Sequence, residues 1–196
     1  MNIKKILIII FLLNLNNNYV YSLEPDIFVQ NTVNRASQIL SKNISKEEKI
    51  NELKNIAKET VDIKGVGFYS LGSARKNLDD NEKKKYLNLF ENYFLKSFSS
   101  RLAEYTDPEI EVKGKKFINE KYTIVNSILV ATSNRPEVNI DWRVYTKNPN
   151  NPVIRDLIIE GLSLARTQKE EFASILNSND GDINALFKSL EEFYKN

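Results

Sequence analysis

The chain contains no cysteine and no histidine. Without histidine it lacks the commonest general base, and without cysteine it lacks thiolate nucleophiles, so the usual ligands of transition metals are also missing. The same absence rules out disulfide bonds and a lipid attached to an N-terminal cysteine. We therefore expect no metal site and no cofactor, and most hydrolase mechanisms are excluded.

Catalysis by carboxylates is compatible with the composition, because a pair of acids is sufficient for glycoside hydrolysis. The candidates are Asp141, Asp156 and Glu160, on or beside predicted strands. Arg143 and Arg155 occur in the same strands, and ion pairs across a hairpin would satisfy these acids without catalysis. We favour this structural explanation and predict that the protein is not an enzyme, with a small carboxylate-dependent enzyme as an alternative.

Long hydrophobic runs are missing as well. The apolar block from Ile6 to Leu13 is far shorter than the roughly 20 residues that a transmembrane helix needs. Two lysines precede the block, and compact residues follow it at the positions that a signal peptidase reads. This pattern predicts an export signal over residues 1–22, cleaved after Ser22, and a single domain over residues 23–196.

Neither sign of charge is in excess after that cleavage. Removing residues 1–22 takes away two lysines and no acid, which leaves 26 basic and 26 acidic side chains. The lysine-rich tracts at 46–58 and 113–116 hold or adjoin acidic residues, as solvated surfaces do. Nucleic-acid binding needs a basic face. We therefore expect no nucleic-acid partner.

Hydrophobic residues recur at helical spacing through the first half of the chain. The segment from Pro25 to Leu40 has one apolar stripe, and Ser45 opens a capping box for a second helix. The segment from Asp62 to Gly72 holds three glycines and predicts a short or bent helix. Our hypothesis is that Gly65 and Gly67 let this helix move.

A long helix with an aromatic stripe is predicted from Asp79 onward. The stripe consists of Tyr86, Leu89, Phe90, Tyr93, Phe94, Phe98, Leu102 and Tyr105. Such a stripe is typical of a core helix that packs on a sheet. The same side chains would equally line an apolar cavity, and the sequence leaves both interpretations open.

The second half of the chain has the alternation of β-strands. Residues 138–145 alternate with a period of two, and Val153 to Ile159 follows a proline-containing turn to complete a hairpin. Ile110 and Val112 open an earlier strand, and Tyr122 to Thr132 forms another whose two faces are both apolar. Strands grouped between helices predict an α+β fold. We expect a helical N-terminal half and C-terminal helices packed on a curved antiparallel sheet of about four strands, enclosing an apolar pocket.

One series of residues resembles a known protein family. The series follows the last long strand and consists of Asp156, Glu160, Gly161, Ser163, Leu164, Lys169, Phe172 and Gly181. The helix from Pro25 to Leu40 resembles the opening helix of that family. Leu71-Gly72, followed by Phe90, Phe94 and Leu102, resembles the long central helix of the family and the residues before it. In this order the motifs resemble the MlaC family, the periplasmic phospholipid-binding proteins of the Mla system, also called the toluene-tolerance auxiliary component.

The resemblance implies a function and a set of partners. MlaC-like proteins are periplasmic carriers that shuttle glycerophospholipids between the inner and outer membranes and so maintain outer-membrane lipid asymmetry. The implied partners are an inner-membrane ABC transporter with an MCE-domain subunit and an outer-membrane lipoprotein–porin complex. We accordingly expect a monomer whose phospholipid is cargo and not a cofactor.

Ten hydrophobic residues are predicted to line the lipid pocket, each on a face expected to point inward. They are Phe68, Leu71, Phe90, Phe94, Phe98, Ile124, Ile128, Ile140, Trp142 and Val144. Ordinary core packing is the alternative for each of them. If the core is filled throughout, the alternative function is a periplasmic interaction or adaptor protein without a ligand.

Overall fold

The computed structural model describes residues 23–195, so the predicted export signal at 1–22 lies outside the described residues. In chain order the elements are α2 (Pro25–Leu40), α3 (Lys46–Thr60), α4 (Ile63–Leu71), the 3₁₀ helix η1 (Gly72–Lys76), α5 (Asp80–Leu102), β1 (Ile110–Asn119), β2 (Tyr122–Leu129), β3 (Val138–Tyr145), β4 (Val153–Ile159), β5 (Leu162–Ser163), α6 (Leu164–Asn177) and α7 (Ile183–Lys195). The α+β prediction is confirmed, with the two-residue β5 added to the four predicted strands. Within 23–195, no helix is both long and apolar enough to cross a membrane.

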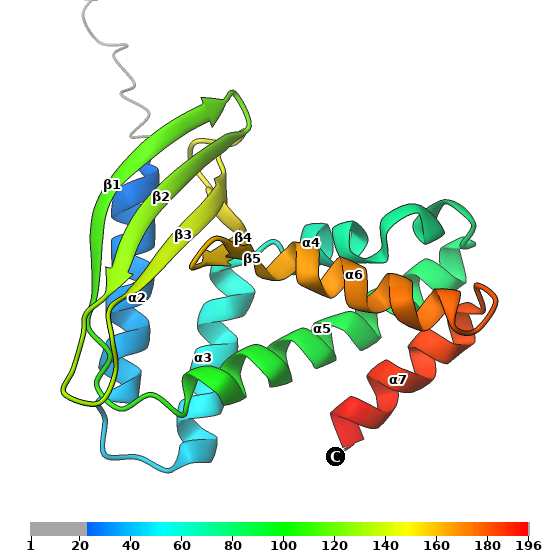
Figure 1. Cartoon of the computed structure of the whole chain (residues 1–196), viewed down its shortest axis with the longest axis horizontal. Coiled ribbons are helices and arrows are strands. Elements are labelled where there is room, and N and C mark those ends of the chain that lie inside the picture. Colours follow the sequence, from blue (N-terminus) through cyan, green and yellow to red (C-terminus); the bar gives the residue numbers. More distant parts are fainter. Residues whose placement is uncertain (1–22, 196) are drawn as a thin grey trace, which may run out of the picture.

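The strands form one antiparallel meander in the order β1-β2-β3-β4-β5. Figure 1 shows the curved sheet with α2 packed along it, while α4 to α7 extend away from the sheet as a separate layer. Val125, Trp142 and Leu157 lie side by side across β2, β3 and β4 on the inner face. This face points toward α2 and toward the space between the two layers.

The inward direction predicted for Ile124 and Ile128 is wrong. Along β2, buried and half-exposed residues alternate, and the buried set includes Val125 and Leu129. A strand places successive side chains on opposite faces, so a strand that is apolar on both faces fits two orientations equally well. Ile124 and Ile128 therefore lie half-exposed on the outer face. Ile124 is paired there with Arg143 of β3.

A first group of buried side chains, which we call the sheet cluster, joins α2 to the inner face of the sheet. It consists of Phe28, Val29, Val33, Val125, Leu129, Ile140, Trp142, Val144 and Ile154. Polar contacts fix the helix to the edge strand as well: the Val112 N–H donates to Gln30 Oε1 (3.1 Å), and the Ser37 hydroxyl donates to the carbonyl of Pro108 (2.8 Å). The predicted apolar stripe of this helix is thus buried against strands that come about 80 residues later.

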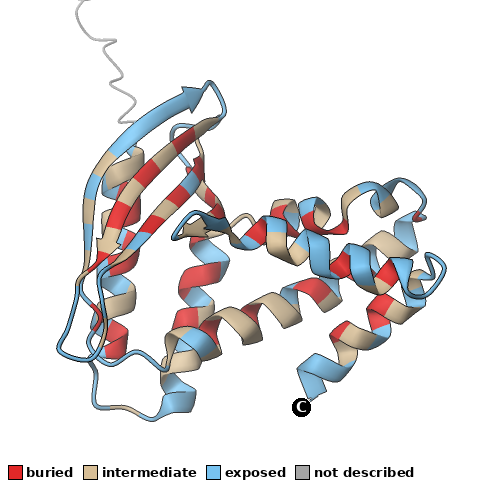
Figure 2. Ribbon diagram, viewed as in Figure 1, coloured by how far each residue is buried: buried red, intermediate tan, exposed pale blue. Residues whose placement is uncertain are grey.

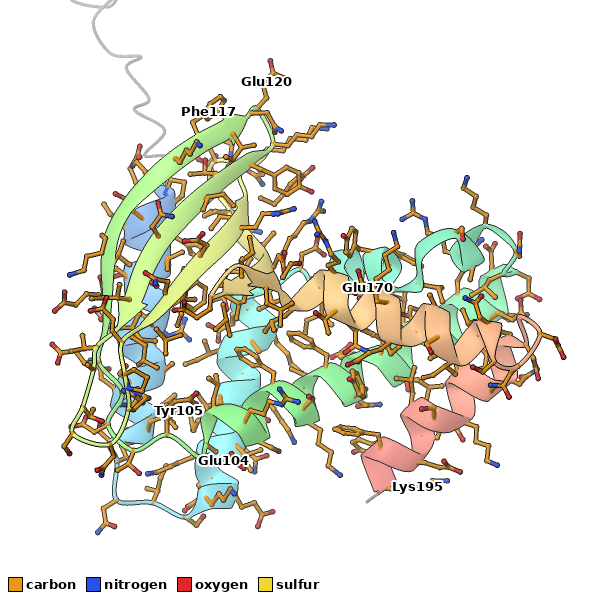
Figure 3. The ribbon with its side chains drawn as sticks, in the orientation of Figure 1. Glu104, Tyr105, Phe117, Glu120, Glu170 and Lys195 are labelled. Atoms are coloured by element: carbon orange, nitrogen blue, oxygen red, sulfur yellow. The ribbon has the colours of Figure 1, made fainter. Side chains whose placement is uncertain are left out.

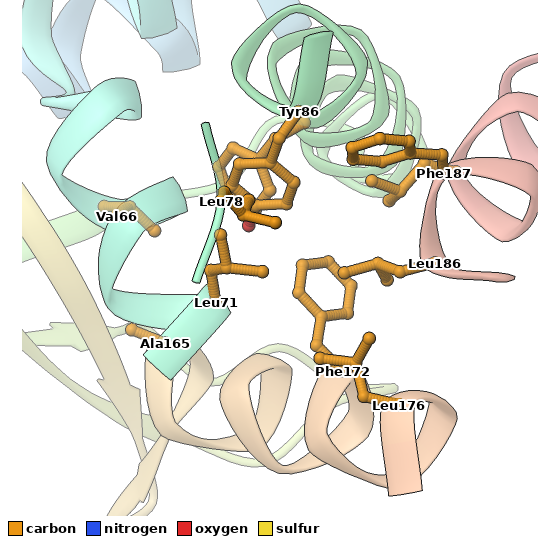
Figure 4. Close-up of a cluster of buried hydrophobic side chains, with 11 residues drawn as sticks. Val66, Leu71, Leu78, Tyr86, Ala165, Phe172, Leu176, Leu186 and Phe187 are labelled. Atoms are coloured by element: carbon orange, nitrogen blue, oxygen red, sulfur yellow. The ribbon is translucent and has the colours of Figure 1, made fainter. Parts of the chain in front are cut away.

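A second group, the helix cluster, holds α4, α5, α6 and α7 together (Figure 4). It consists of Val66, Leu71, Leu78, Tyr86, Phe90, Ala165, Phe172, Leu176, Leu186, Phe187 and Leu190. Phe172 meets the rings of Tyr86 and Phe90 edge-on, at interplanar angles of 85° and 88°. Edge-to-face contacts of this kind add to the energy of apolar burial. The helical layer therefore has a core of its own.

Close packing is sufficient to explain both glycines of α4. A Cβ at Gly67 would lie 2.8 Å from a ring carbon of Phe90, and one at Gly65 would lie 2.3 Å from the Asp62 carboxylate that caps the helix. Glycine is the residue that allows such approaches. The hinge hypothesis stays a prediction.

Replacing Tyr86 by phenylalanine tests how firmly α4 and α5 are joined. The Tyr86 side chain is fully buried, and its hydroxyl donates to the Gly67 carbonyl at 2.8 Å. We expect the Tyr86→Phe change to lower the free energy of unfolding by about 0.5–1.5 kcal/mol. The measurement is urea denaturation followed by circular dichroism.

Tyr69→Phe is the matched control, because this tyrosine is 44% exposed on α4, the helix whose Gly67 carbonyl accepts the hydrogen bond from Tyr86. An exposed substitution of this kind should change the stability by less than about 0.5 kcal/mol. Equal effects of the two substitutions would contradict the packing described above.

Stability should also fall in alkaline solution. Burial raises the pKa of Tyr86 and of Tyr93, and the Glu171 carboxylate raises that of Tyr93 further. A phenol with a raised folded-state pKa stabilises fully below its unfolded pKa of about 10, and this contribution is lost as the pH rises above that value. We expect the unfolding free energy to decline above about pH 10, and to decline less steeply in Tyr86→Phe, by up to about 1.4 kcal/mol per pH unit. Identical slopes in urea titrations at several alkaline pH values would contradict this.

Candidate functional site

A cavity of about 380 Å³ lies between the inner face of the sheet and the helices. Its volume falls at the lower end of the roughly 300–1,000 Å³ that is typical of small-molecule pockets. Most of the side chains around it are apolar. Those from α2, α3, α5 and the sheet include Val33, Ala36, Leu53, Ile56, Ala57, Phe90, Phe94, Phe98, Leu129, Ile140, Trp142, Leu157 and Ile159.

One wall of the cavity is the aromatic face of α5. Phe90, Phe94 and Phe98 recur every four residues, and their successive ring centroids are 6.1 and 5.6 Å apart. Phe90 is 1% exposed within the helix cluster, whereas Phe94 and Phe98 are half-buried and line the cavity. The two interpretations of this stripe thus apply to different turns of the same helix. Phe90 belongs mainly to the core and only borders the cavity, whereas Phe94 and Phe98 form the cavity wall.

The opposite wall is the sheet, where Ile140 and Trp142 face the cavity. The indole N–H of Trp142 donates to the Ser127 hydroxyl at 2.8 Å, and that hydroxyl donates to the Ile140 carbonyl at 3.1 Å. A buried indole usually needs such a partner. Because Ser127 satisfies the indole, Trp142 exposes only carbon to the cavity on this wall.

Five of the ten residues predicted for the pocket lie around this cavity. They are Phe90, Phe94, Phe98, Ile140 and Trp142. The other five lie elsewhere: Leu71 is buried in the helix cluster, Val144 is buried in the sheet cluster, Phe68 is half-buried outside the lining, and Ile124 and Ile128 are on the outer face of the sheet. These five residues are as apolar as the lining residues, but they either pack against other elements or lie on another surface.

The sequence also left several lining residues unrecognised. Val33 and Ala36 of α2, and Leu53 and Ala57 of α3, all line the cavity. Their positions on amphipathic stripes indicate burial, which is equally true of core residues. Small side chains such as Ala36 and Ala57 on those stripes are the one local signal of adjacent space.

The rim of the cavity is partly polar. The Tyr93 hydroxyl donates to Gln168 Oε1 at 2.7 Å, and Gln168 Nε2 donates to the Glu171 carboxylate at 3.0 Å. The Phe193 ring lies 4.8 Å from that of Tyr93, and Arg101 also reaches the rim. Gln168 is a polar residue on the otherwise apolar stripe of α6.

The candidate catalytic carboxylates have structural partners. Asp156 accepts hydrogen bonds from the Ser163 hydroxyl (2.7 Å) and the Ala165 N–H (3.0 Å), and so caps α6. Asp141 accepts one from the amide of Asn126 at 2.8 Å, and Glu160 accepts one from the backbone of Asn139. In residues 23–195, no three acidic side chains cluster in a way that could hold a metal ion.

The ion pairs predicted across the β3–β4 hairpin are wrong. Arg155 instead pairs with Asp62, at 2.6 Å, and donates to the Tyr122 hydroxyl at 2.9 Å. Its guanidinium carbon lies 3.8 Å from the centre of the Tyr145 ring. Partial burial is the largest single influence on the pKa of Arg155, and it lowers the pKa. The hydrogen bonds to Tyr122 and Asp62 together outweigh it, so the pKa of Arg155 lies above its usual value. The arginine therefore joins the sheet to the first residues of α4.

The arrangement is suited to holding an apolar molecule. Most of its lining is apolar, the Trp142 indole is hydrogen-bonded by Ser127, and the charged residues of the lining are few: Arg101, Arg155, Asp156 and Glu171. A molecule with long hydrocarbon chains and a polar end would match both parts.

Comparisons with known proteins agree with this reading of the fold. A phospholipid-binding protein from Ralstonia solanacearum, solved in complex with a phospholipid, has a TM-score of 0.74 with this chain at 18% sequence identity. The similarity covers 88% of this chain and 98% of that chain. No curated protein sequence matches the chain. The profile of the MlaC protein family matches residues 30–192, which confirms the resemblance inferred from the motifs. The chain belongs to the MlaC family.

Proposed function

We propose that the protein is a periplasmic carrier that binds glycerophospholipids by their acyl chains and shuttles them between the inner and outer membranes. The observation that carries this proposal is the apolar cavity between α5 and the sheet. Membership of the MlaC family supports it, as does the phospholipid bound to the structurally similar Ralstonia solanacearum protein. Such traffic would help to maintain the lipid asymmetry of the outer membrane.

The energetics of lipid transfer require an enclosed apolar site. Each methylene contributes about 0.8 kcal/mol when it is removed from water, so two chains with about thirty methylenes oppose free transfer by on the order of 20 kcal/mol. A carrier must offset nearly all of this. The walls formed by Phe94, Phe98 and Trp142 supply the apolar surface to do so.

A cavity of about 380 Å³ is small for a two-chain lipid, so loading requires the two layers to move apart. The sheet cluster and the helix cluster lie on opposite sides of the cavity and share no buried residue. A third buried cluster, Ile39, Leu40, Leu53 and Ile56, joins α2 to α3, so the layers would open away from that end while each keeps its own core.

The proposed partners are those of the family: an inner-membrane ABC transporter with an MCE-domain subunit, and an outer-membrane lipoprotein–porin complex. Export through the signal at residues 1–22 would deliver the chain to the periplasm, where it would act as a monomer. The phospholipid is cargo, and the proposal needs no cofactor and no catalytic step.

The first test is native mass spectrometry of the protein purified from a bacterial periplasm, followed by lipid extraction. We expect one bound diacyl phospholipid per chain. The Phe94→Glu substitution places a carboxylate on the cavity wall and should weaken lipid binding by about 2 kcal/mol, or roughly thirtyfold. Ser97→Trp, which fills the cavity without burying a charge, should also exclude the lipid.

Ile124→Glu is the matched control for Phe94→Glu. It introduces the same carboxylate on the outer face of the sheet, away from the cavity, and should retain the lipid. Thermal melts identify any variant that fails to fold. A lipid-free mass for the wild type, with no uptake from labelled vesicles, would contradict the carrier function and favour an interaction protein without a ligand.

Affinity should depend on the acyl chains more than on the headgroup. The cavity walls are apolar, and Arg101 and Arg155 are far from forming a dense cationic cluster that would select one phosphate ester. We expect phosphatidylethanolamine and phosphatidylglycerol with equal chains to bind within about threefold of each other, because apolar burial dominates. Removing one chain, as in a lysophospholipid, should weaken binding far more than any headgroup exchange. Competition with a fluorescent phospholipid measures both, and a headgroup effect larger than the chain effect would contradict the assignment.

A further inference from the structure

The tip of the β1–β2 hairpin carries large hydrophobic side chains that nothing in the described chain covers. Phe117 is 69% exposed and Ile118 is 48% exposed. Figure 3 shows Phe117 and Glu120 at one extreme end of the molecule, and Figure 2 shows this end of β1 exposed. Leu23 and Ile27, at the start of α2, are 38% and 52% exposed.

These hydrophobic residues belong to the same end of the molecule. Lys115 of β1 contacts both Glu24 and Asp26 at the start of α2, with a distance of 2.8 Å to Asp26. Phe117 is two residues nearer to the tip and faces the same side as Lys115, so it projects beyond the first turn of the helix. The sheet cluster ends before it.

The hairpin holds this tip in a fixed position. Phe117 is paired with Thr123 and Asn119 with Tyr122, which leaves a two-residue turn at Glu120 and Lys121. The N–H of Lys121 donates to the Asn119 side chain at 2.9 Å. Along β1 the backbone groups that face β2 are hydrogen-bonded, so the tip keeps its hairpin geometry, and the polar groups on the outer edge of β1 suit the hydrated headgroup region more than the hydrocarbon interior.

Unpaired lysines surround the exposed hydrophobic residues. Lys116 and Lys121 make no ion pair within residues 23–195, and neither does Lys147, which is beside Lys121 because the Thr146 N–H donates to the Lys121 carbonyl at 2.9 Å. Glu120 is the one acid in the turn. Glu24 and Asp26 are occupied by their contacts with Lys115, so the charges left at this end are Lys116, Lys121 and Lys147 against Glu120, and with all seven counted the end has one basic side chain in excess.

We propose that the β1–β2 tip is a membrane-contact site for a bilayer that contains anionic phospholipid. Phe117 and Ile118 enter the interfacial region, and Lys116 and Lys121 stay at the level of the headgroups, where their long side chains reach the lipid phosphates. Lysines on an edge strand also prevent pairing with other strands, but that role does not require an exposed phenylalanine beside them. The proposal rests on the carrier function only in that a lipid carrier meets membranes.

The contact site is separate from the cavity. The rim of the cavity is formed by α5, α6 and the end of α7, and Figure 3 shows Tyr105 of the rim and Lys195 of α7 remote from Phe117. The tip can therefore rest on a bilayer while the rim stays accessible.

Vesicle flotation tests the proposal, with phosphatidylethanolamine–phosphatidylglycerol vesicles compared with neutral phosphatidylcholine vesicles. We expect the wild type to float with the anionic vesicles and to bind less in high salt. The Phe117→Ser, Ile118→Ser double variant should lose at least about tenfold in vesicle partitioning. Lys116→Gln and Lys121→Gln should each lose about fivefold.

Two controls are matched to these substitutions on a different surface. Tyr69→Ser and Lys64→Gln alter an exposed hydrophobic residue and an exposed lysine of α4 and should leave flotation unchanged. The cavity variant Phe94→Glu should lose its bound lipid yet still float, and the hairpin variants should keep their bound lipid. Failure of the contact site is thereby distinguished from failure of the carrier function.

Several results would overturn the proposal. One is a wild type that floats with neither kind of vesicle, and another is a set of hairpin variants that float as well as the wild type. A third is a dimer in sedimentation velocity that depends on Phe117 and occurs without vesicle binding. That result would assign the tip to contact with a second copy of the chain. If the double variant unfolds, the single Phe117→Ser variant, at a side chain that is 69% exposed, provides the same comparison.

Discussion

The division of the hydrophobic side chains into separate clusters is the constraint on which the structure depends. One cluster fixes α2 to the sheet, another holds α4 to α7 together, and the cavity is the space between them. A chain of this size could bury the same side chains in a single core. Because it does not, the sheet layer and the helical layer are two bodies with a core each, joined at one end by a third cluster of Ile39, Leu40, Leu53 and Ile56, and the region between them is available to a ligand.

The last long strand connects these two bodies through three consecutive residues. Ile154 accepts a hydrogen bond from the Asp62 N–H at 3.0 Å, Arg155 pairs with the Asp62 carboxylate, and Asp156 caps the first turn of α6. Asp62 itself caps α4. The two ends of the helical layer, the start of α4 and the start of α6, are thus fixed to the same three residues of β4.

Local sequence signals predicted much of this fold, and side-chain orientation was the main source of error. The capping box predicted at Ser45 is formed, since a cap depends on residues within one turn, and the long helix begins after Asp79 as predicted. The face chosen for Ile124 was wrong because β2 is apolar on both sides. The partner of Arg155 was wrong because Asp62 is distant in the sequence. Half of the residues predicted for the pocket lie outside the cavity lining, because a core and an apolar cavity require the same side chains.

The long sequence separation between α2 and its strands has a consequence for how the chain folds. The meander itself forms from neighbouring hairpins, which are local contacts, but Val29 can be buried only after Trp142 has been made. Contacts between residues so far apart form slowly, since a long loop must close first. During synthesis, α2 therefore emerges early and keeps Phe28, Val29 and Val33 exposed until more than half of the chain has followed, so the newly made protein depends on being kept from aggregation over that interval.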